Sequence, residues 1–325
     1  IIFNFCESDI EKKNLRSLIE KAYKNFNDSE VVKIKRIGNI NLLELYNGPT
    51  LAFKDVAMQV IGNMYDELKL AEDKNINIVV ATSGDTGSAA ISALNDKKNI
   101  NVFVLHPHNK ISNIQRKIMT TIGSENIYNI AVKGTFDDCQ KIVKDMFFDD
   151  QYRRKINMSG VNSINWARIM CQIVYYFYTS FKFPNKKLNF SVPTGNFGDV
   201  YAGYVAKKMG LSINKLIVAT NENDILQRVI NSGEYKPSQV KPSLSPSMDI
   251  QVSSNFERQM YESMNYNSDD IKVIMQMFND NKDYQFDEKV LQNFQSIYSS
   301  TAVSNETTIE TIKLFYEKYN YLADP

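Results

Sequence analysis

Cysteine and histidine are scarce, with three and two copies in 325 residues. Cys6, Cys139 and Cys171 are far apart and odd in number, which excludes a disulfide framework and indicates reduced, buried thiols in a cytosol-like compartment. His106 and His108 flank a proline with no cysteine nearby, a poor arrangement for a metal ion. We interpret both histidines as loop residues and expect a cytoplasmic protein without a metal centre.

Charge of one sign is also lacking. Lys and Arg number 38 against 37 for Asp and Glu, so a net charge of +1 gives no basic footprint for nucleic acid and no charged tail. The longest aromatic and apolar run, IVYYFYTSFKF at 173–183, is too short to span a bilayer and predicts a buried helix. No signal peptide is visible. We therefore expect a small-molecule partner, with no nucleic acid and no membrane.

What the sequence does contain is a recurring strand–loop–helix pattern. Strands that alternate with helices predict parallel sheets covered on both faces, hence an α/β fold. Ligands of such sheets bind beyond the carboxyl ends of the strands, where the polar loops of this chain lie. The expected strands are 76–81, 102–105, 126–132, 188–192 and 215–219, and the expected helices are 87–95, 137–148, 199–209 and 224–231. The segment 235–247 is expected to be a surface loop, and 269–321 is expected to be helical and charged, with an internal loop near 279–283.

The segment 42–59, LLELYNGPTLAFKDVAMQ, places Lys54 between an aromatic residue and an acid. A turn precedes this lysine and an apolar-periodic helix follows it. Burial would favour the neutral amine, which is the nucleophile in Schiff-base chemistry. On this segment alone, an ordinary lysine at the start of a helix is the better interpretation.

The loop in SVPTGNFGDVYAG, residues 191–203, joins an expected strand to an expected helix. Gly195 and Gly198 allow the backbone to approach an anion, and the N-terminus of the helix supplies free N–H groups. The pattern is neither GxxxxGK[ST] nor GxGxxG, so nucleoside triphosphates are disfavoured. An ordinary strand-to-helix turn explains this loop equally well.

A second loop, ATSGDTGS at 81–88, also lies at the start of a helix. The hydroxyls of Ser83 and Thr86 and the amides around Gly84 and Gly87 suit a carboxylate or a phosphate. Asp85 argues against simple anion binding unless its side chain turns away. We expect Asp85 to hold the loop as an Asx-type turn.

A third segment, VNSINWARIM at 161–170, sets Arg168 beside Asn162, Ser163 and Asn165. Such an arginine is a fork for phosphate or carboxylate, although a structural ion pair explains it as well. We interpret Trp166 as a core residue. Two anion sites and one special lysine together indicate a phosphorylated cofactor bound through the lysine and a substrate with anionic groups of its own.

With these motifs in order, the chain resembles the threonine synthases, which are pyridoxal-phosphate (PLP) enzymes. The resemblance is to their longer, fungal and bacterial type, and it runs from about the first fifty residues to the last line of the sequence. Several motifs extend over eight or more residues. The segments that carry it are NGPTLAFKD, ATSGDTGSAA, NSINWARI, SVPTGNFGD, ATNENDIL and SPSMDI.

The resemblance implies a tryptophan-synthase-β-like fold, PLP fold type II. Such a fold has two three-layer, doubly wound, mainly parallel-sheet domains with the cofactor in the cleft between them. Residues 1–54 and 166–325 would form the large cofactor-binding domain, and 55–165 the smaller, mobile domain that binds the substrate carboxylate. In the family a threonine beyond LADP faces the pyridine nitrogen. This sequence ends at Pro325, so N- and C-terminal segments of the parent protein are expected to be absent. The protein would be a monomer or a homodimer.

The resemblance also implies site residues. Lys54 would be the catalytic residue and would bind PLP as a Schiff base. The cofactor and its phosphate would be surrounded by Gly195, Asn196, Phe197, Gly198 and Asp199. The substrate would be bound by Ser83, Asp85 and Thr86 on the side of its carboxylate, and by Asn162, Ser163 and Arg168, together with Asn196, on the side of its phosphate.

The implied reaction converts O-phosphohomoserine and water to L-threonine and phosphate in threonine biosynthesis. The enzyme would be a PLP-dependent carbon–oxygen lyase that acts on a phosphate ester. One alternative is a PLP-dependent phospho-lyase or serine/threonine dehydratase that gives a keto acid, and Arg168 favours the phosphorylated substrate over the simple dehydratase. A second alternative is a non-catalytic relative that acts as a binding module.

Overall fold

The chain forms two compact units. The computed structural model describes residues 1–67, 75–280 and 283–325. The units comprise Ile1–Lys35 with Asn41–Val174, and Arg36–Ile40 with Tyr175–Pro325. The domain boundaries predicted from the sequence stay a prediction.

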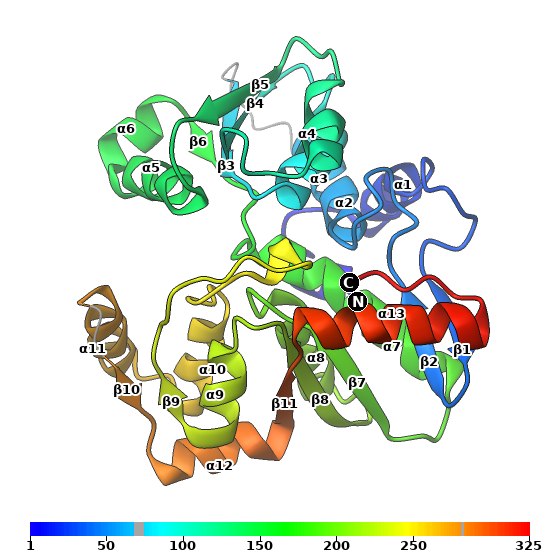
Figure 1. Cartoon of the computed structure of the whole chain (residues 1–325). Helices are drawn as coiled ribbons and strands as arrows, with labels where there is room; N and C mark the ends of the chain where they lie inside the picture. The colour runs from blue at the N-terminus through cyan, green and yellow to red at the C-terminus, as the bar shows by residue number, and fades with distance from the viewer. Residues whose placement is uncertain (68–74, 281–282) are drawn as a thin grey trace. The chain divides into compact units, whose positions relative to one another are not determined.

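The first unit contains a parallel four-stranded sheet in the order β5-β4-β3-β6. Its strands are β3 (Ile76–Ala81), β4 (Ile100–Pro107), β5 (Ile127–Val132) and β6 (Met158–Ser159). Figure 1 shows helix α5 on one face of this sheet and α3 on the other. The helices of this unit are η1 (Ile2–Phe5), α1 (Lys12–Ala22), α2 (Lys54–Glu67), α3 (Asp85–Leu94), α4 (Asn113–Thr120), α5 (Phe136–Phe148) and α6 (Asp150–Lys155).

Strand β3 is buried on both faces from Ile78 to Val80, which explains the apolar run that follows Asn77. Ile78 and Val80 belong to the larger core, together with residues of α2 and α3. Val79 points to the opposite face, where it joins a smaller core with Cys139 and Val143 of α5. Because successive side chains of a strand alternate between faces, a stretch that is covered on both sides has apolar residues at successive positions.

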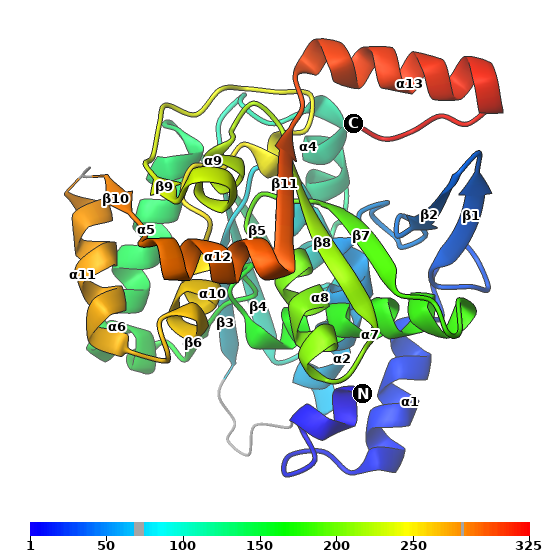
Figure 2. The same ribbon diagram turned by 90° about the horizontal axis from the view of Figure 1, so that it is seen from below.

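The second unit contains a parallel three-stranded sheet in the order β11-β8-β7, visible in Figure 2. Its strands are β7 (Leu188–Pro193), β8 (Ile213–Thr220) and β11 (Tyr298–Ala302). Helices α8, α9 and α12 pack against β8. The helices of this unit are α8 (Gly198–Lys208), α9 (Ile225–Ser232), η2 (Pro246–Met248), α10 (Phe256–Ser263), α11 (Ser268–Asn279), α12 (Glu288–Ile297) and α13 (Asn305–Tyr319).

The division between the units falls inside a small sheet and a helix. It runs through the two-stranded sheet of β1 (Lys33–Ile37) and β2 (Ile40–Glu44) and through helix α7 (Trp166–Lys182). Helix α7 contains most of the apolar run at 173–183 and confirms that prediction. No helix in the described part of the chain is long and apolar enough to cross a membrane.

The strand predictions are confirmed, and β3 matches its predicted range to the residue. Strand β4 is longer than predicted and includes His106, which is buried. The loop prediction for His106 is therefore wrong, whereas His108 lies in an exposed turn. Pairing with β5 extends the strand, because His106 lies opposite Ala131 and Pro107 opposite Val132. The predicted helices are also present, with starts and ends shifted by one or two residues.

Two other predictions are wrong in part. The stretch predicted to be helical contains β11, which pairs with β8 along its whole length. The expected surface loop begins with Tyr235, which is 1% exposed and belongs to β9 (Glu234–Tyr235). Strand β9 pairs antiparallel with β10 (Tyr284–Gln285). In both cases the strand is fixed by a partner that is distant in the sequence.

Candidate active site

Lys54 is the first residue of helix α2, and its side chain is almost fully buried. The backbone N–H groups of Asp55 and Val56 donate to the carbonyls of Ala52 and Phe53, so a tight turn leads directly into the helix. The Lys54 ammonium lies 4.9 Å from the centroid of the Phe53 ring, within cation–π distance. The start of α2 therefore carries an amine that is shielded from water.

A carboxylate of the second loop faces this amine. Nζ of Lys54 lies 3.0 Å from Oδ2 of Asp85, the first residue of α3. Burial lowers the pKa of Lys54 below its usual value, while the neighbouring carboxylate of Asp85 opposes this effect. The guanidinium of Arg168 lowers the pKa of Lys54 further. The amine is thus easier to deprotonate than an exposed lysine.

Asp55, which the sequence analysis left without a role, fixes the backbone beside Lys54. Its buried carboxylate accepts hydrogen bonds from the backbone N–H of Thr50 at 2.7 Å and from its hydroxyl at 2.8 Å. A Cβ on Gly48 would lie 2.3 Å from Cβ of Asp55, so only glycine fits there. The Asn-Gly-Pro turn before Lys54 is the feature of the sequence that could have indicated this role of Asp55. A turn so close to the start of a helix needs a side chain that joins the turn to the helix.

Thr82, rather than Asp85, holds the ATSGDTGS loop. The hydroxyl oxygen of Thr82 accepts hydrogen bonds from the backbone N–H groups of Gly84 and Gly87, both at 2.9 Å. The expected Asx-type turn of Asp85 is therefore wrong, because its side chain is turned toward Lys54. Ser83 and Thr86 are half-buried, and neither hydroxyl bonds to another residue within the described ranges.

The NSINWAR segment lies at the start of α7 and orients Arg168 inward. Arg168 is 4% exposed, and its Nη1 donates to the carbonyl of Val161 at 3.2 Å. Asn165 supports this turn, since its Oδ1 accepts from the backbone N–H of Ala167 at 2.9 Å. Oδ1 of Asn162 is buried and accepts no hydrogen bond from any residue that the structure describes. Trp166 packs edge-on against Phe5, as a partly buried core residue.

In the second unit, the loop 195–198 leads into helix α8. Phe197 has φ +64°, an uncommon conformation for a residue with a side chain, and its ring packs in the core against Phe256 and Tyr298. The carbonyl of Asn196 accepts from the backbone N–H of Asn255 at 3.0 Å. The ring of Phe197 is thus committed to the core. The first-turn N–H groups of α8 have no partner within the helix and remain as donors for an anion.

Asp199, in the first turn of α8, is engaged by two tyrosines of α7. Its Oδ1 accepts from the hydroxyl of Tyr175 at 2.6 Å and from that of Tyr176 at 2.9 Å. Burial raises the pKa of Asp199 to about 6, although both hydrogen bonds act in the opposite direction. Neither tyrosine is predicted as a site residue from the sequence, because the run IVYYFY indicates only a buried helix.

Gly195 allows a second loop to approach. A Cβ at this position would lie 2.9 Å from Cα of Met248, in the SPSMDI segment. That segment is held by Asp249, whose Oδ1 accepts from the side-chain amides of Asn221 at 2.8 Å and Asn223 at 3.1 Å. The ATNEND and SPSMDI motifs are thus parts of one structure beside Gly195.

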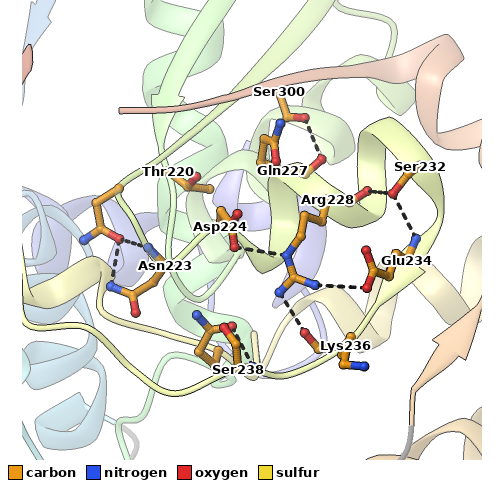
Figure 3. A network of polar contacts seen from close by, with 12 residues as sticks. Thr220, Asn223, Asp224, Gln227, Arg228, Ser232, Glu234, Lys236, Ser238 and Ser300 are labelled. Carbon is orange, nitrogen blue, oxygen red and sulfur yellow. Dashed lines mark hydrogen bonds and ion pairs between the residues drawn. The ribbon is translucent and has the colours of Figure 1, made fainter. Parts of the chain in front are cut away.

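The same network continues along α9. Figure 3 shows Asn223 on one side and the Asp224–Arg228 pair on the other. Nε of Arg228 donates to Oδ1 of Asp224 at 3.0 Å, and its Nη2 donates to the carbonyl of Lys236 at 2.7 Å. These contacts fix the segment after α9, so the arginine has a structural role.

Comparisons with known proteins agree with these motifs. A family model described as pyridoxal-phosphate dependent enzyme matches residues 29–280. The threonine synthase of Saccharomyces cerevisiae is 45% identical over 351 residues, covering 98% of this chain and 68% of that protein. The threonine synthase of Pseudomonas aeruginosa is 43% identical over 324 residues, covering 99% and 69%. The crystal structure of PLP-bound threonine synthase from Brucella melitensis superposes with a TM-score of 0.92 at 43% identity, covering 99% of this chain and 70% of that one.

The matches and the parallel-sheet α/β architecture confirm the predicted fold class, which is tryptophan-synthase-β-like, fold type II. They also confirm the resemblance that the motifs indicated. The roles of the individual site residues stay predictions. The chain belongs to the pyridoxal-phosphate-dependent enzymes and, within them, to the threonine synthases.

Proposed function

We propose that this protein converts O-phosphohomoserine and water to L-threonine and phosphate. The observation that carries the proposal is the buried amine of Lys54, 3.0 Å from the carboxylate of Asp85, in a chain of the threonine synthase family. Arg168 adds a buried positive charge that acts on the same amine. An acid–base group and an anion-binding group are what elimination of a phosphate requires.

The residues fit the cofactor of the family. A buried primary amine suits the aldehyde of PLP, and the first-turn N–H groups of α8 suit its phosphate. We propose that the cofactor is held by Lys54 and by the loop of Gly195, Asn196, Phe197, Gly198 and Asp199. Phe197 would contribute its backbone, and Asp199 would be kept in place by its hydrogen bond from Tyr175. When bound, PLP supplies an electron sink for carbanions of the substrate.

Lys54 is proposed to move protons at Cα and Cβ of the substrate. Burial lowers the pKa of Lys54, which favours the neutral amine that a general base needs. Asp85 then stabilises the ammonium form after the proton is taken up. A base that alternates between two charge states needs both a dry site and a counterion, and α2 and α3 supply them.

The substrate's anionic groups are proposed to bind at two places in the first unit. The hydroxyls of Ser83 and Thr86 would bind the carboxylate, beside Asp85. Asn162 and Ser163 would orient the phosphate against Arg168, whose planar fork matches phosphate oxygens. Charge that develops on the departing phosphate would be stabilised there. Removal of one such donor typically raises the barrier by about 2–4 kcal/mol.

Predictions about the partner, the location, the assembly and the domain motion accompany this function. The partner is proposed to be a phosphorylated amino acid, the location the cytoplasm, and the assembly a monomer or a homodimer. Residues 55–165 are proposed to act as a mobile substrate domain, and closure of such a domain would exclude water from the reacting groups.

The test is a product assay with the purified protein. O-phosphohomoserine should yield threonine and phosphate in equal amounts, with little keto acid. Lys54→Ala should abolish both products and the visible absorbance of the bound cofactor. Keto acid as the main product would instead support a phospho-lyase or dehydratase. Binding of PLP in stoichiometric amount without turnover of O-phosphohomoserine to any of these products would support a binding module.

A further inference from the structure

Asp85 has a second partner, Gln115, which lies outside the three loops of the candidate site. Nε2 of Gln115, in the first turn of α4, donates to Oδ1 of Asp85 at 2.6 Å. The other carboxylate oxygen of Asp85 faces Lys54. One carboxylate thus bridges the first turn of α4 and the first residue of α2.

Ser112 sets the orientation of the Gln115 amide. Its hydroxyl donates to Oε1 of Gln115 at 3.0 Å and accepts from the backbone N–H of Gln115 at 3.2 Å, as the N-cap of α4. Because Oε1 is occupied as an acceptor, the NH₂ group must point at Asp85. The contacts form a directed chain from Ser112 through Gln115 and Asp85 to Lys54.

Gly84 is shaped to admit this glutamine. Its φ is +142°, and a Cβ there would lie 2.3 Å from Cδ of Gln115. Any side chain at position 84 would therefore strain the backbone and displace the amide. The glycine that precedes Asp85 in TSGDTG serves the contact between α4 and the acid, in addition to any role in binding an anion.

We propose that Gln115, oriented by Ser112, is a positioning residue that holds the carboxylate of Asp85 against the amine of Lys54. A hydrogen bond on Oδ1 favours the charged carboxylate and restricts its rotation, so that Oδ2 stays on Nζ. The inference rests on the proposed role of Lys54. It adds a residue that controls the protonation of that lysine without touching the substrate.

Three charged groups act on the Lys54 amine. Asp85 comes from α3, Arg168 from α7 and Asp55 from α2 itself. Asp55 is fixed by the two hydrogen bonds from Thr50, and Arg168 is anchored on the carbonyl of Val161. Gln115 contacts Asp85 among these groups, so loss of Gln115 should weaken the counterion that lies 3.0 Å from Nζ.

The experiment measures the titration of Lys54 in cofactor-free protein. Gln115→Leu is labelled with a trace of acetic anhydride between pH 6 and 10, and acetylation of Lys54 is read by mass spectrometry. With its counterion loosened, Lys54 should titrate at lower pH, so that labelling below the midpoint rises about three- to tenfold. Asp85→Asn should give a larger rise in the same direction. Ser112→Ala should give a smaller one, and melting curves establish that each variant is folded.

Two comparisons decide the outcome. Gln59→Leu is the control, because Gln59 is also half-buried but lies on α2 and its amide bonds to Ser92. This substitution should leave the titration of Lys54 unchanged. In an Asp85→Asn background, Gln115→Leu should have no further effect, because its action passes through Asp85. An unchanged titration in Gln115→Leu, or an equal effect in the Asn background, overturns the proposal. Since no cofactor or substrate is present, either result is independent of the proposed reaction.

Discussion

The hydroxyl of Tyr175 lies 2.6 Å from Oδ1 of Asp199, and this contact ties helix α7 to the first turn of α8. Tyr176 donates to the same carboxylate oxygen and to the backbone carbonyl of Asp199. An acid near a helix N-terminus is favourable, but here its position is fixed by two neighbouring phenols. The glycine loop that precedes α8 is thus supported from behind by α7.

Asp199→Asn should remove the loss of stability that this group causes as the pH rises from about 5 to 7.5. The pKa of Asp199 in the fold is about 6, above the value of about 3.9 for an unfolded chain. The stabilising contribution of the protonated group is complete below the unfolded pKa and is lost as the pH rises through about 6. Asparagine stays neutral. The stability of the variant relative to the parent should therefore rise by about 1–2 kcal/mol between pH 5 and 7.5.

Urea unfolding of protein stripped of cofactor with hydroxylamine measures this difference. Glu125→Gln, which neutralises an exposed acid, is the control and should leave the curve unchanged. If Asp199→Asn tracks the parent at every pH, Asp199 is ionised in the fold and its raised pKa is refuted.

Gly48→Ala should destabilise the first unit by about 1–3 kcal/mol, because the new methyl group overlaps the Asp55 side chain. Asp55 would have to move, and both of its hydrogen bonds from Thr50 would be lost. The free energy of unfolding in urea is the measurement. Gly123→Ala is the matched control, since a Cβ there meets nothing within 4 Å. Equal effects of the two substitutions would refute the role of Gly48 in seating Asp55.

The fold class was predictable because its signal is local. A strand buried on both faces, such as β3, is mostly apolar and rich in β-branched residues, and the following glycine loop marks the end of the strand. Strand β11 gave no such signal. Its sequence YSSTA is mostly polar because only Tyr298 is buried, and its extended conformation is imposed by pairing with β8. An edge strand of this kind is defined by its neighbour.

The candidate site shows the same contrast. That Lys54 is buried at the start of a helix could be predicted from its own segment, because the turn, the lysine and the helix are contiguous. The contact of Asp85 with Lys54 could not be predicted, since the two residues lie 31 positions apart. The local sequence around Asp85 favoured an Asx turn instead. Gln115 and Tyr175 belong to unremarkable helical segments. Their roles follow from which helix starts meet in the folded chain.

Arg168→Ala should raise the KM for O-phosphohomoserine about 10–100-fold, because a charge-assisted hydrogen bond contributes about 1.5–3 kcal/mol. PLP retention should change little, since Arg168 is assigned to the substrate. Steady-state kinetics and the absorbance of bound cofactor are measured on the same samples. Arg168→Lys should recover only part of the loss, because an ammonium does not replace the planar fork.

The exposed Arg116 offers a control, and Arg116→Ala should behave as the parent. The buried carbonyl of Val161 loses its donor in Arg168→Ala, so some stability is lost as well, and assays are run well below the melting temperature. Parallel loss of cofactor and substrate affinity would assign Arg168 to the cofactor instead.

Thr82→Val should loosen the loop that carries Asp85. Two backbone N–H groups, those of Gly84 and Gly87, lose their common acceptor, which costs about 2–4 kcal/mol for the pair. Thr82→Ser keeps the oxygen and gives up only the methyl group that faces Gly87, so it should cost less than about 1.5 kcal/mol. Hydrogen exchange at both glycine amides should accelerate in the valine variant alone. Faster exchange in the serine variant than in the valine variant would mean that the methyl group, and not the hydroxyl, holds the loop in place.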